Sequence, residues 1–293
     1  MKVLKLVRKI IRSYRVKQIE YIKSQISHDP LNPQLHLKLA QSYKGAKMRD
    51  LAIACYRTAK YLGAKIECRM GVTPPLHEFP VDQYIRYKTV ADTINSKYEG
   101  TTVLDVGGGA GRLGYFMPTQ EYILADPKWN GITALPLPFE DNGIDVTCAI
   151  DTLEHIPREM RKKFLSEMIR VAKNEIHVVV PTMLPTEYPD YNEFFYHITQ
   201  AEETREHIEY KVPTLEELHL LIQTCREEVN LDLQYEIKPC GSLIIIPLVL
   251  SYWLVENNKA KLSEINKYFN KYFYDELTTK GLPIEHHIII QKR

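Results

Sequence analysis

The spacing of apolar residues divides the chain into predicted helices and strands. Apolar side chains recur every three or four residues over 2–26, 33–65, 81–98 and 158–172, which predicts amphipathic helices in these segments. Short, mostly apolar runs at 103–106, 122–125, 146–150 and 176–181 instead predict buried strands. Two more strands, over 231–238 and 284–292, are expected to close the sheet. The pattern therefore predicts an all-helical segment followed by helices and strands that alternate.

The first predicted strand leads directly into a glycine-rich turn. Asp105 stands near the end of this strand, and Gly107, Gly109 and Gly111 follow at alternate positions before an expected helix. Glycines have no Cβ, so a backbone of this kind can approach a ligand closely. A carboxylate at Asp105 would repel a phosphate. The acid therefore argues against a phosphate as the ligand of this turn.

The same turn also fits the dinucleotide-binding fingerprint, as Gly109-x-Gly111-x-x-Gly114. That motif requires an acid about 20 residues further on, and Asp126, after the apolar run 122–125, can supply it. An acid at this position would bind ribose hydroxyls in either case. Asp126 therefore does not separate a nicotinamide dehydrogenase from other nucleoside-binding enzymes, and only the downstream sequence does.

Two downstream blocks stand in a diagnostic order after the glycine turn. Residues 135–139 read Leu-Pro-Leu-Pro-Phe, and residues 153–157 read Leu-Glu-His-Ile-Pro. With the turn, they resemble the class I S-adenosylmethionine-dependent methyltransferases, in the type 11 branch related to quinone- and sugar-modifying enzymes. The resemblance extends from about residue 81 to the C-terminus. It implies a Rossmann-like, doubly wound α/β fold whose sheet is mostly parallel with an antiparallel last strand.

Residues 127–131 depart from that fold, because they leave no room for the helix that usually follows the second strand. The resemblance also implies which residues surround S-adenosylmethionine. They are Asp105, Gly107, Gly109 and Gly111 at the methionine part, Asp126 at the ribose hydroxyls, Ala134 and Leu135 at the adenine, and Asp151 at the strand edge where open α/β sheets bind ligands.

Three residues are candidates for catalytic groups: Asp151, His155 and His207. His155 is either a base or a packed or capping histidine. His207 belongs to an aromatic-rich insertion at 182–212, and its surroundings resemble methyltransferases of cell-surface polysaccharide clusters. It is either a base for a sugar hydroxyl or a surface residue near the start of a helix. No metal is predicted, because His286 and His287 point to opposite faces of a strand.

A base is not essential to the expected reaction. A sulfonium is already an activated leaving group, so much of the acceleration can come from positioning the two reactants.

The first 65 residues form a helical segment of unusual charge. Residues 1–30 carry eight basic side chains against two acidic ones, whereas the whole chain has a net charge of +1. A basic amphipathic helix either lies on an anionic membrane surface or packs its apolar side on neighbouring helices.

The following helix pair resembles a single tetratricopeptide repeat, with Leu39, Ala40, Tyr43, Ala52, Tyr56 and Ala59 at the characteristic positions. One repeat cannot bury both its faces alone. The segment therefore predicts a helical cap or docking surface rather than a peptide-binding array.

Overall composition argues against several other classes of protein. The net charge of +1 gives no general attraction to nucleic acid. The five cysteines contain no C-x-x-C pair, which favours reduced thiols in the cytoplasm over a zinc site or a disulfide framework. No segment reaches the roughly 20 apolar residues that span a bilayer. The apolar stretch 243–255 is either a buried helix or a surface that meets lipid or a partner.

The sequence thus predicts a helical appendage at 1–70 and a methyltransferase domain at 81–293, with insertions at about 182–212 and 243–278. The expected activity is methyl transfer from S-adenosylmethionine to an oxygen of a small-molecule, saccharide or glycolipid acceptor. The alternative is a non-catalytic cofactor-binding or scaffold module that acts through its N-terminal helices. The expected location is the cytoplasm, either free or peripheral at the inner membrane face, with residues 1–65 as the contact to membrane or protein.

Overall fold

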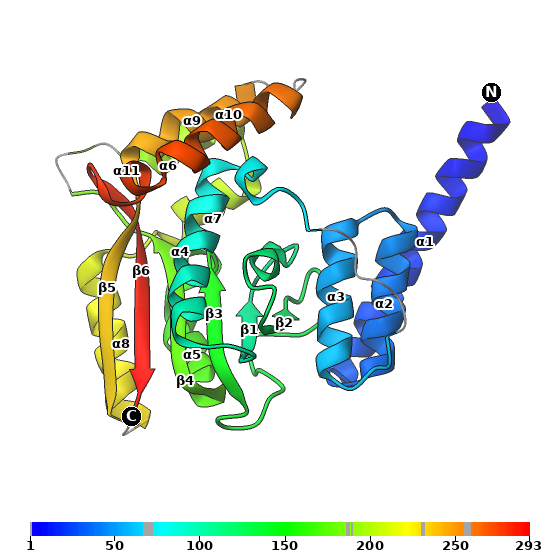
Figure 1. The fold of residues 1–293 in the computed structure, drawn as a ribbon, viewed down its shortest axis with the longest axis horizontal. Coiled ribbons are helices and arrows are strands. Elements are labelled where there is room, and N and C mark those ends of the chain that lie inside the picture. The colour runs from blue at the N-terminus through cyan, green and yellow to red at the C-terminus, as the bar shows by residue number, and fades with distance from the viewer. Residues whose placement is uncertain (1, 67–72, 186–187, 189, 230–231, 255–258) are drawn as a thin grey trace.

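A six-stranded sheet forms the centre of the computed structural model, which describes residues 2–66, 73–185, 188, 190–229, 232–254 and 259–293 (Figure 1). The strand order is β2-β1-β3-β4-β6-β5. The strands are β1 (Thr102–Val106), β2 (Glu121–Ala125), β3 (Ile144–Ile150), β4 (Ala172–Pro181), β5 (Leu233–Ser242) and β6 (Pro283–Lys292). The first four are parallel, and β6 runs antiparallel to both its neighbours. The predicted Rossmann-like α/β fold with an antiparallel last strand is confirmed.

Helices precede the sheet, cover both its faces and extend over one of its edges (Figure 1). The α-helices are α1 (Lys2–His28), α2 (Pro33–Gly45), α3 (Arg49–Tyr61), α4 (Val81–Lys97), α5 (Arg158–Val171), α6 (Tyr191–Thr199), α7 (Glu202–Tyr210), α8 (Leu215–Val229), α9 (Ile246–Leu254), α10 (Lys259–Tyr272) and α11 (Tyr274–Thr279). Short 3₁₀ helices are η1 (Leu76–Glu78), η2 (Arg112–Phe116), η3 (Leu153–His155) and η4 (Leu243–Ile245).

Side chains that alternate along each strand divide the interior into two apolar cores. Leu104 and Val106 of β1 pack on one face with α5, α8 and most of α1–α3. Val103 packs on the other face with α4, η2 and α11. Because α5 and α8 cover one face while α4 covers the other, the carboxyl ends of the parallel strands stay accessible between the two layers.

The outer edge of β2 is covered by α3. Ala54 of this helix belongs to one core, whereas Cys55 belongs to the other. Thr58 Oγ1 accepts a hydrogen bond of 3.0 Å from the backbone N–H of Leu124, a donor on the outermost strand of the sheet. The chain between β2 and β3 contains no helix, as the sequence predicted. The sequence did not predict that the N-terminal helix pair packs against this edge.

The N-terminal helices α1–α3 pack against one another and share a hydrophobic core with the sheet. The six positions of the predicted repeat are all buried between α2 and α3. In the second half of α1, Ile19, Ile22 and Ile26 are buried in the same core. The first half of α1 extends away from the sheet (Figure 1). The prediction of an amphipathic helix rests on side chains of residues 2–14, which the structure does not describe.

Both predicted insertions form helices over the carboxyl ends of the parallel strands (Figure 1). The first contributes α6 and α7, and the second contributes η4 and α9–α11. In the apolar stretch of the second insertion, Ile245 is buried but Ile244 is 54% exposed. The side chains of Tyr252 and Trp253 lie outside the described residues. None of the described helices is both long enough and apolar enough to cross a bilayer.

Candidate active site at the carboxyl edge of the sheet

Three acids predicted to bind the cofactor meet at one edge of the sheet. Asp105 is the penultimate residue of β1, Asp126 directly follows β2, and Asp151 directly follows β3. These strands are parallel neighbours, so their carboxyl ends lie side by side. Open α/β sheets bind ligands at this edge.

The three glycines of the turn differ in what surrounds them. Gly107, Gly109 and Gly111 all have left-handed backbone, with φ of 72°, 55° and 71°. A Cβ at Gly109 would meet no atom within 4 Å, whereas a Cβ at Gly107 would lie 2.3 Å from the side chain of Thr152. A Cβ at Gly111 would lie 2.4 Å from that of Ala54 in α3. Gly109 therefore borders open space, while the other two glycines allow close packing.

Asp105 carries an unpaired acceptor beside this turn. Its Oδ2 accepts a hydrogen bond of 2.6 Å from the hydroxyl of Tyr122. Its Oδ1 is buried and has no partner among the described residues. Burial raises the pKa of Asp105 to about 7, and the hydrogen bond from Tyr122 only partly opposes that shift. A cationic group bound here would pair with the free oxygen and favour the carboxylate.

Asp126 ties the second strand to the glycine turn. It accepts hydrogen bonds from the backbone N–H groups of Gly109 at 3.0 Å, Lys128 at 2.9 Å and Trp129 at 3.0 Å. Two carboxylate oxygens provide about four acceptor positions, so one remains for a ribose hydroxyl. Ala134 and Leu135 lie further along this loop, where they are partly buried and pack against the adjoining core.

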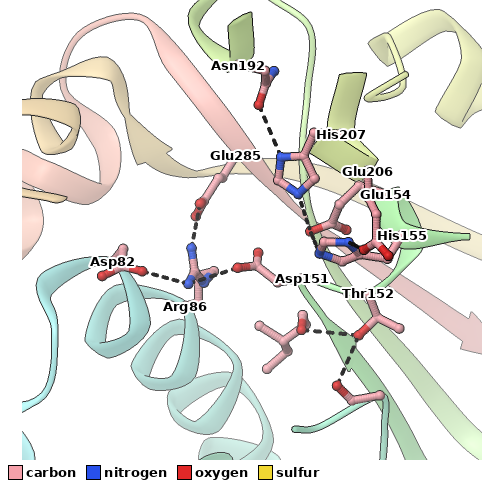
Figure 2. Close-up of polar contacts among 12 residues, drawn as sticks. Asp82, Arg86, Asp151, Thr152, Glu154, His155, Asn192, Glu206, His207 and Glu285 are labelled. Carbon is pink, nitrogen blue, oxygen red and sulfur yellow. Dashed lines mark hydrogen bonds and ion pairs between the residues drawn. The ribbon is translucent and has the colours of Figure 1, made fainter. Parts of the chain in front are cut away.

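Asp151 belongs to a network centred on Arg86 of α4. The guanidinium of Arg86 contacts Asp82 at 2.9 Å, Asp151 at 2.8 Å and Glu285 of β6 at 2.7 Å (Figure 2). Although burial opposes the charge, these carboxylates raise the pKa of Arg86 well above its usual value. Sequence reasoning missed Arg86, Asp82 and Glu285, because nothing local distinguishes them from surface charges.

The structure brings His155 and His207 together from distant parts of the sequence. Their ring centroids are 4.9 Å apart, with Glu154 beside them (Figure 2). His155 Nδ1 lies 2.7 Å from a carboxyl oxygen of Glu206, and His207 Nδ1 lies 3.1 Å from Oδ1 of Asn192. Burial lowers the pKa of His207 to about 3, so this ring is neutral and its Nδ1–H donates to Asn192.

Sequence reasoning also missed Glu154, although it is adjacent to His155 in the block at 153–157. Its side chain is completely buried, which the pattern of the block did not reveal.

A cavity of about 380 Å³ adjoins this cluster. His207, Asp151 and Arg86 contribute to its polar wall, and Tyr191 and Phe195 of α6 add aromatic surface. A cavity of this size suits a small molecule or part of a larger one. It lies over the same strand ends as the glycine turn, so it is a candidate site for a second reactant.

One family of known proteins matches part of the chain. Residues 119–180, which include β2, β3, η3 and α5, match the family described as "Methyltransferase domain". No curated protein was found to match the chain.

Several solved structures are similar to it. A methyltransferase of Thermotoga maritima has 14% identity and a TM-score of 0.42, over 74% of this chain and 99% of its own. One of Archaeoglobus fulgidus has 18% identity and a TM-score of 0.41, over 71% and 94%. Phosphoethanolamine N-methyltransferase 2 of Haemonchus contortus, in complex with S-adenosyl-L-methionine, has 14% identity and a TM-score of 0.42, over 77% and 61%.

The fold and the matched segment bear on the class of protein. Together these findings support an S-adenosylmethionine-dependent methyltransferase.

Proposed function

We propose that the chain transfers a methyl group from S-adenosylmethionine to an oxygen of a small-molecule, saccharide or glycolipid acceptor. The observation that carries this proposal is the buried, unpaired Oδ1 of Asp105 beside the open space at Gly109. An acceptor atom without a partner is costly in a protein interior. A ligand that offers an ammonium group to it would remove that cost.

The residues present fit the cofactor part by part. Asp105 would pair with the ammonium of the methionine moiety, and the backbone at Gly109 would approach it closely. Asp126 would accept a hydrogen bond from a ribose hydroxyl, while Ala134 and Leu135 would contact the adenine. S-adenosylmethionine supplies an electrophilic methyl group on a sulfonium. The contribution of the protein is then to position an acceptor oxygen in line with that methyl group.

The cavity beside His207 is the proposed acceptor site. Tyr191 and Phe195 offer aromatic surface to the apolar face of a sugar or an acyl chain, and Asn192 offers hydrogen bonds. Asp151 lines this cavity, and His155 lies beside His207 at its wall. We assign Asp151, His155 and His207 to the positioning of the acceptor hydroxyl and its proton.

Calorimetry with S-adenosylmethionine and S-adenosylhomocysteine tests the cofactor assignment. Binding of both at one site per chain is expected, and absence of binding by folded protein would overturn the proposal. Mass spectrometry of extracts incubated with a methyl-labelled cofactor then identifies the acceptor. Binding without turnover on any fraction would favour the alternative of a non-catalytic scaffold.

We also propose a peripheral membrane contact through α1. Its first half extends away from the sheet (Figure 1), and residues 1–30 carry eight basic side chains against two acidic ones, whereas the rest of the chain has a negative net charge. Such a contact would suit an acceptor held at a membrane surface. Attachment of this kind is reversible and weakened by salt.

A further inference from the structure

We propose that Glu154, His155 and His207 form a binding site for one divalent first-row transition-metal ion. Two histidine nitrogens and a carboxylate are a ligand set that Zn²⁺, Mn²⁺ and Fe²⁺ share. The site is separate from the glycine turn and from Asp126. It was not foreseen from the sequence, where only the adjacent His286 and His287 were considered as ligands.

The first observation concerns Glu154. Its side chain is completely buried, and neither of its carboxyl oxygens has a hydrogen-bond partner in another described residue. Burying a carboxylate without partners is among the most costly arrangements in a protein, and such groups are normally paired or bind a metal. Its Oε1 lies 3.8 Å from Nε2 of His155 and 3.9 Å from Nε2 of His207. Both distances are too long for hydrogen bonds.

The second observation concerns the orientation of the two rings. Nδ1 of His155 faces Glu206 at 2.7 Å, and Nδ1 of His207 faces Asn192 at 3.1 Å. Both partners are acceptors, so each Nδ1 carries a proton, and in the neutral ring each Nε2 has a lone pair for a metal ion. The three side chains point toward one another (Figure 2). Metal-binding histidines are typically fixed in this way by a carboxylate or another oxygen on the second nitrogen.

The spacing of the ligand atoms suits a small ion. One atom from each of the three residues lies within 4.8 Å of the other two. Around a tetrahedral ion with bonds of about 2.1 Å, ligand atoms lie about 3.4 Å apart. The carboxyl–imidazole distances of 3.8 and 3.9 Å therefore need to shorten by only a few tenths of an ångström. The separation of the two histidine ligand atoms, which is at most 4.8 Å, would have to shorten more.

The negative charge around the site also favours a bound cation. Asp82, Asp151 and Glu285 surround the single guanidinium of Arg86, and Glu154 adds a fourth carboxyl group nearby. Asp151 and Glu285 both act electrostatically on Glu154. A divalent cation at Glu154 would offset this excess of negative charge. Packing alone gives no reason for four acids to meet at one buried place.

Three protein ligands leave at least one position for another oxygen. His207 forms part of the wall of the cavity, so that position can be taken by water or by an oxygen of the acceptor. This consequence rests on the proposed function, since it assigns the ion the role of holding an acceptor oxygen near the cofactor. The binding of the ion itself does not rest on it.

The test uses the full chain after removal of metals with a chelator. Titration with Co²⁺, followed by its visible absorption, and with Zn²⁺, followed by calorimetry, should show one ion per chain. Glu154→Gln and His207→Ala should each weaken binding by at least about 100-fold. Asn192→Leu, which removes only the partner of His207, should weaken it by about 10- to 100-fold.

His197→Ala is the matched control, because His197 is an exposed histidine of the same insertion and its loss should leave binding unchanged. Circular dichroism establishes that each variant is folded, and Glu154→Gln keeps the shape of the side chain. The inference is overturned if the folded wild-type chain binds neither ion, or if Glu154→Gln binds as tightly as wild type. Calorimetry with S-adenosylmethionine on the same preparations separates this outcome from failure of the proposed function.

Discussion

At the scale of single residues, Asp105 and Gly109 are the proposed point of approach for the cofactor. Asp105 presents a buried oxygen without a partner, and the turn beside it is open only at Gly109. Gly107 and Gly111 share the left-handed backbone but pack against Thr152 and Ala54. Three glycines that look equivalent in the sequence therefore differ structurally: two allow close packing, and one borders open space.

This difference makes Gly109→Ala a selective test of cofactor binding. A Cβ at this position should strain the left-handed backbone by about 1–2 kcal/mol and should project into the space that the methionine part would occupy. We expect S-adenosylmethionine affinity, measured by calorimetry, to fall by at least about 10-fold. Gly63→Ala is the control, because Gly63 also has positive φ and open surroundings. It should lose similar stability and no affinity, and equal affinities in both variants would contradict the assignment.

At the scale of elements, α3 acts as the lateral cover of the sheet. Arg57 donates hydrogen bonds to the backbone oxygens of Gly114, Met117 and Gln120, which surround the end of η2 and the start of β2. Thr58 supplies the acceptor for the N–H of Leu124. An uncovered edge strand tends to pair with other chains. The N-terminal helices thus stabilise the strand that carries Asp126 at its end.

Thr58→Val tests this role with little change in shape. The variant removes the partner of a buried backbone N–H, which should lower the free energy of unfolding by about 1–3 kcal/mol in urea denaturation. Thr224→Val provides the comparison. The hydroxyl of Thr224 donates to the backbone oxygen of Leu220 on an exposed surface, as that of Thr58 does to Ala54, but it accepts no bond from a strand. That change should stay within about 0.5 kcal/mol. A similar small effect for Thr58→Val would mean that water can reach the edge of β2.

At the scale of the whole molecule, buried histidines between β4 and β6 should limit stability in acid. His177 Nδ1 lies 2.9 Å from His287 Nε2, and both rings are completely or almost completely buried. Burial lowers the pKa of both groups below the ordinary value of 6.5. The unfolded chain then binds more protons than the folded chain below pH 6.5, so stability falls as the pH drops through this range.

Glu175 adds a second loss of folding stability at lower pH. Burial disfavours its carboxylate, but hydrogen bonds from His177 and Lys97 outweigh that effect and lower its pKa from 4.5 to about 2. The stability it provides is complete above pH 4.5 and is lost as the pH falls toward 2. Urea denaturation over a pH series should therefore show two successive declines. Glu175→Gln should remove the lower one, and an unchanged pH profile would contradict the role of this group.

The proposed membrane contact is also a property of the whole molecule. We expect the full chain to co-sediment with anionic vesicles at low salt. Replacement of Lys5, Lys9 and Arg12 by Gln should weaken binding by up to about 100-fold, because each basic residue near an anionic surface contributes about 1 kcal/mol.

The matched control replaces the exposed Lys60, Lys163 and Lys173 by Gln and should bind like the wild type. Deleting all of α1 would be a poorer test, since it would also uncover Ile19, Ile22 and Ile26. Equal sedimentation of both triple variants would leave α1 as a packing element only.

The local sequence pattern was sufficient to predict the strands, the glycine turn and the absence of a helix between β2 and β3. These features depend on neighbouring residues, since periodicity and the absence of a Cβ act within a few positions. The juxtaposition of Asp105, Asp126 and Asp151 could also be predicted from the sequence, because parallel strands present their carboxyl ends at one edge of the sheet.

Only the tertiary structure decided which distant groups meet over that edge. It placed α3 beside β2, Arg86 among three carboxylates, and His207 of the insertion against His155. It also showed that Glu154, adjacent to His155 in the sequence, is buried without a partner. The physical reason is that these contacts depend on how α3, α4 and the helices of the insertion dock on the sheet, and no local spacing encodes the docking of one element on another.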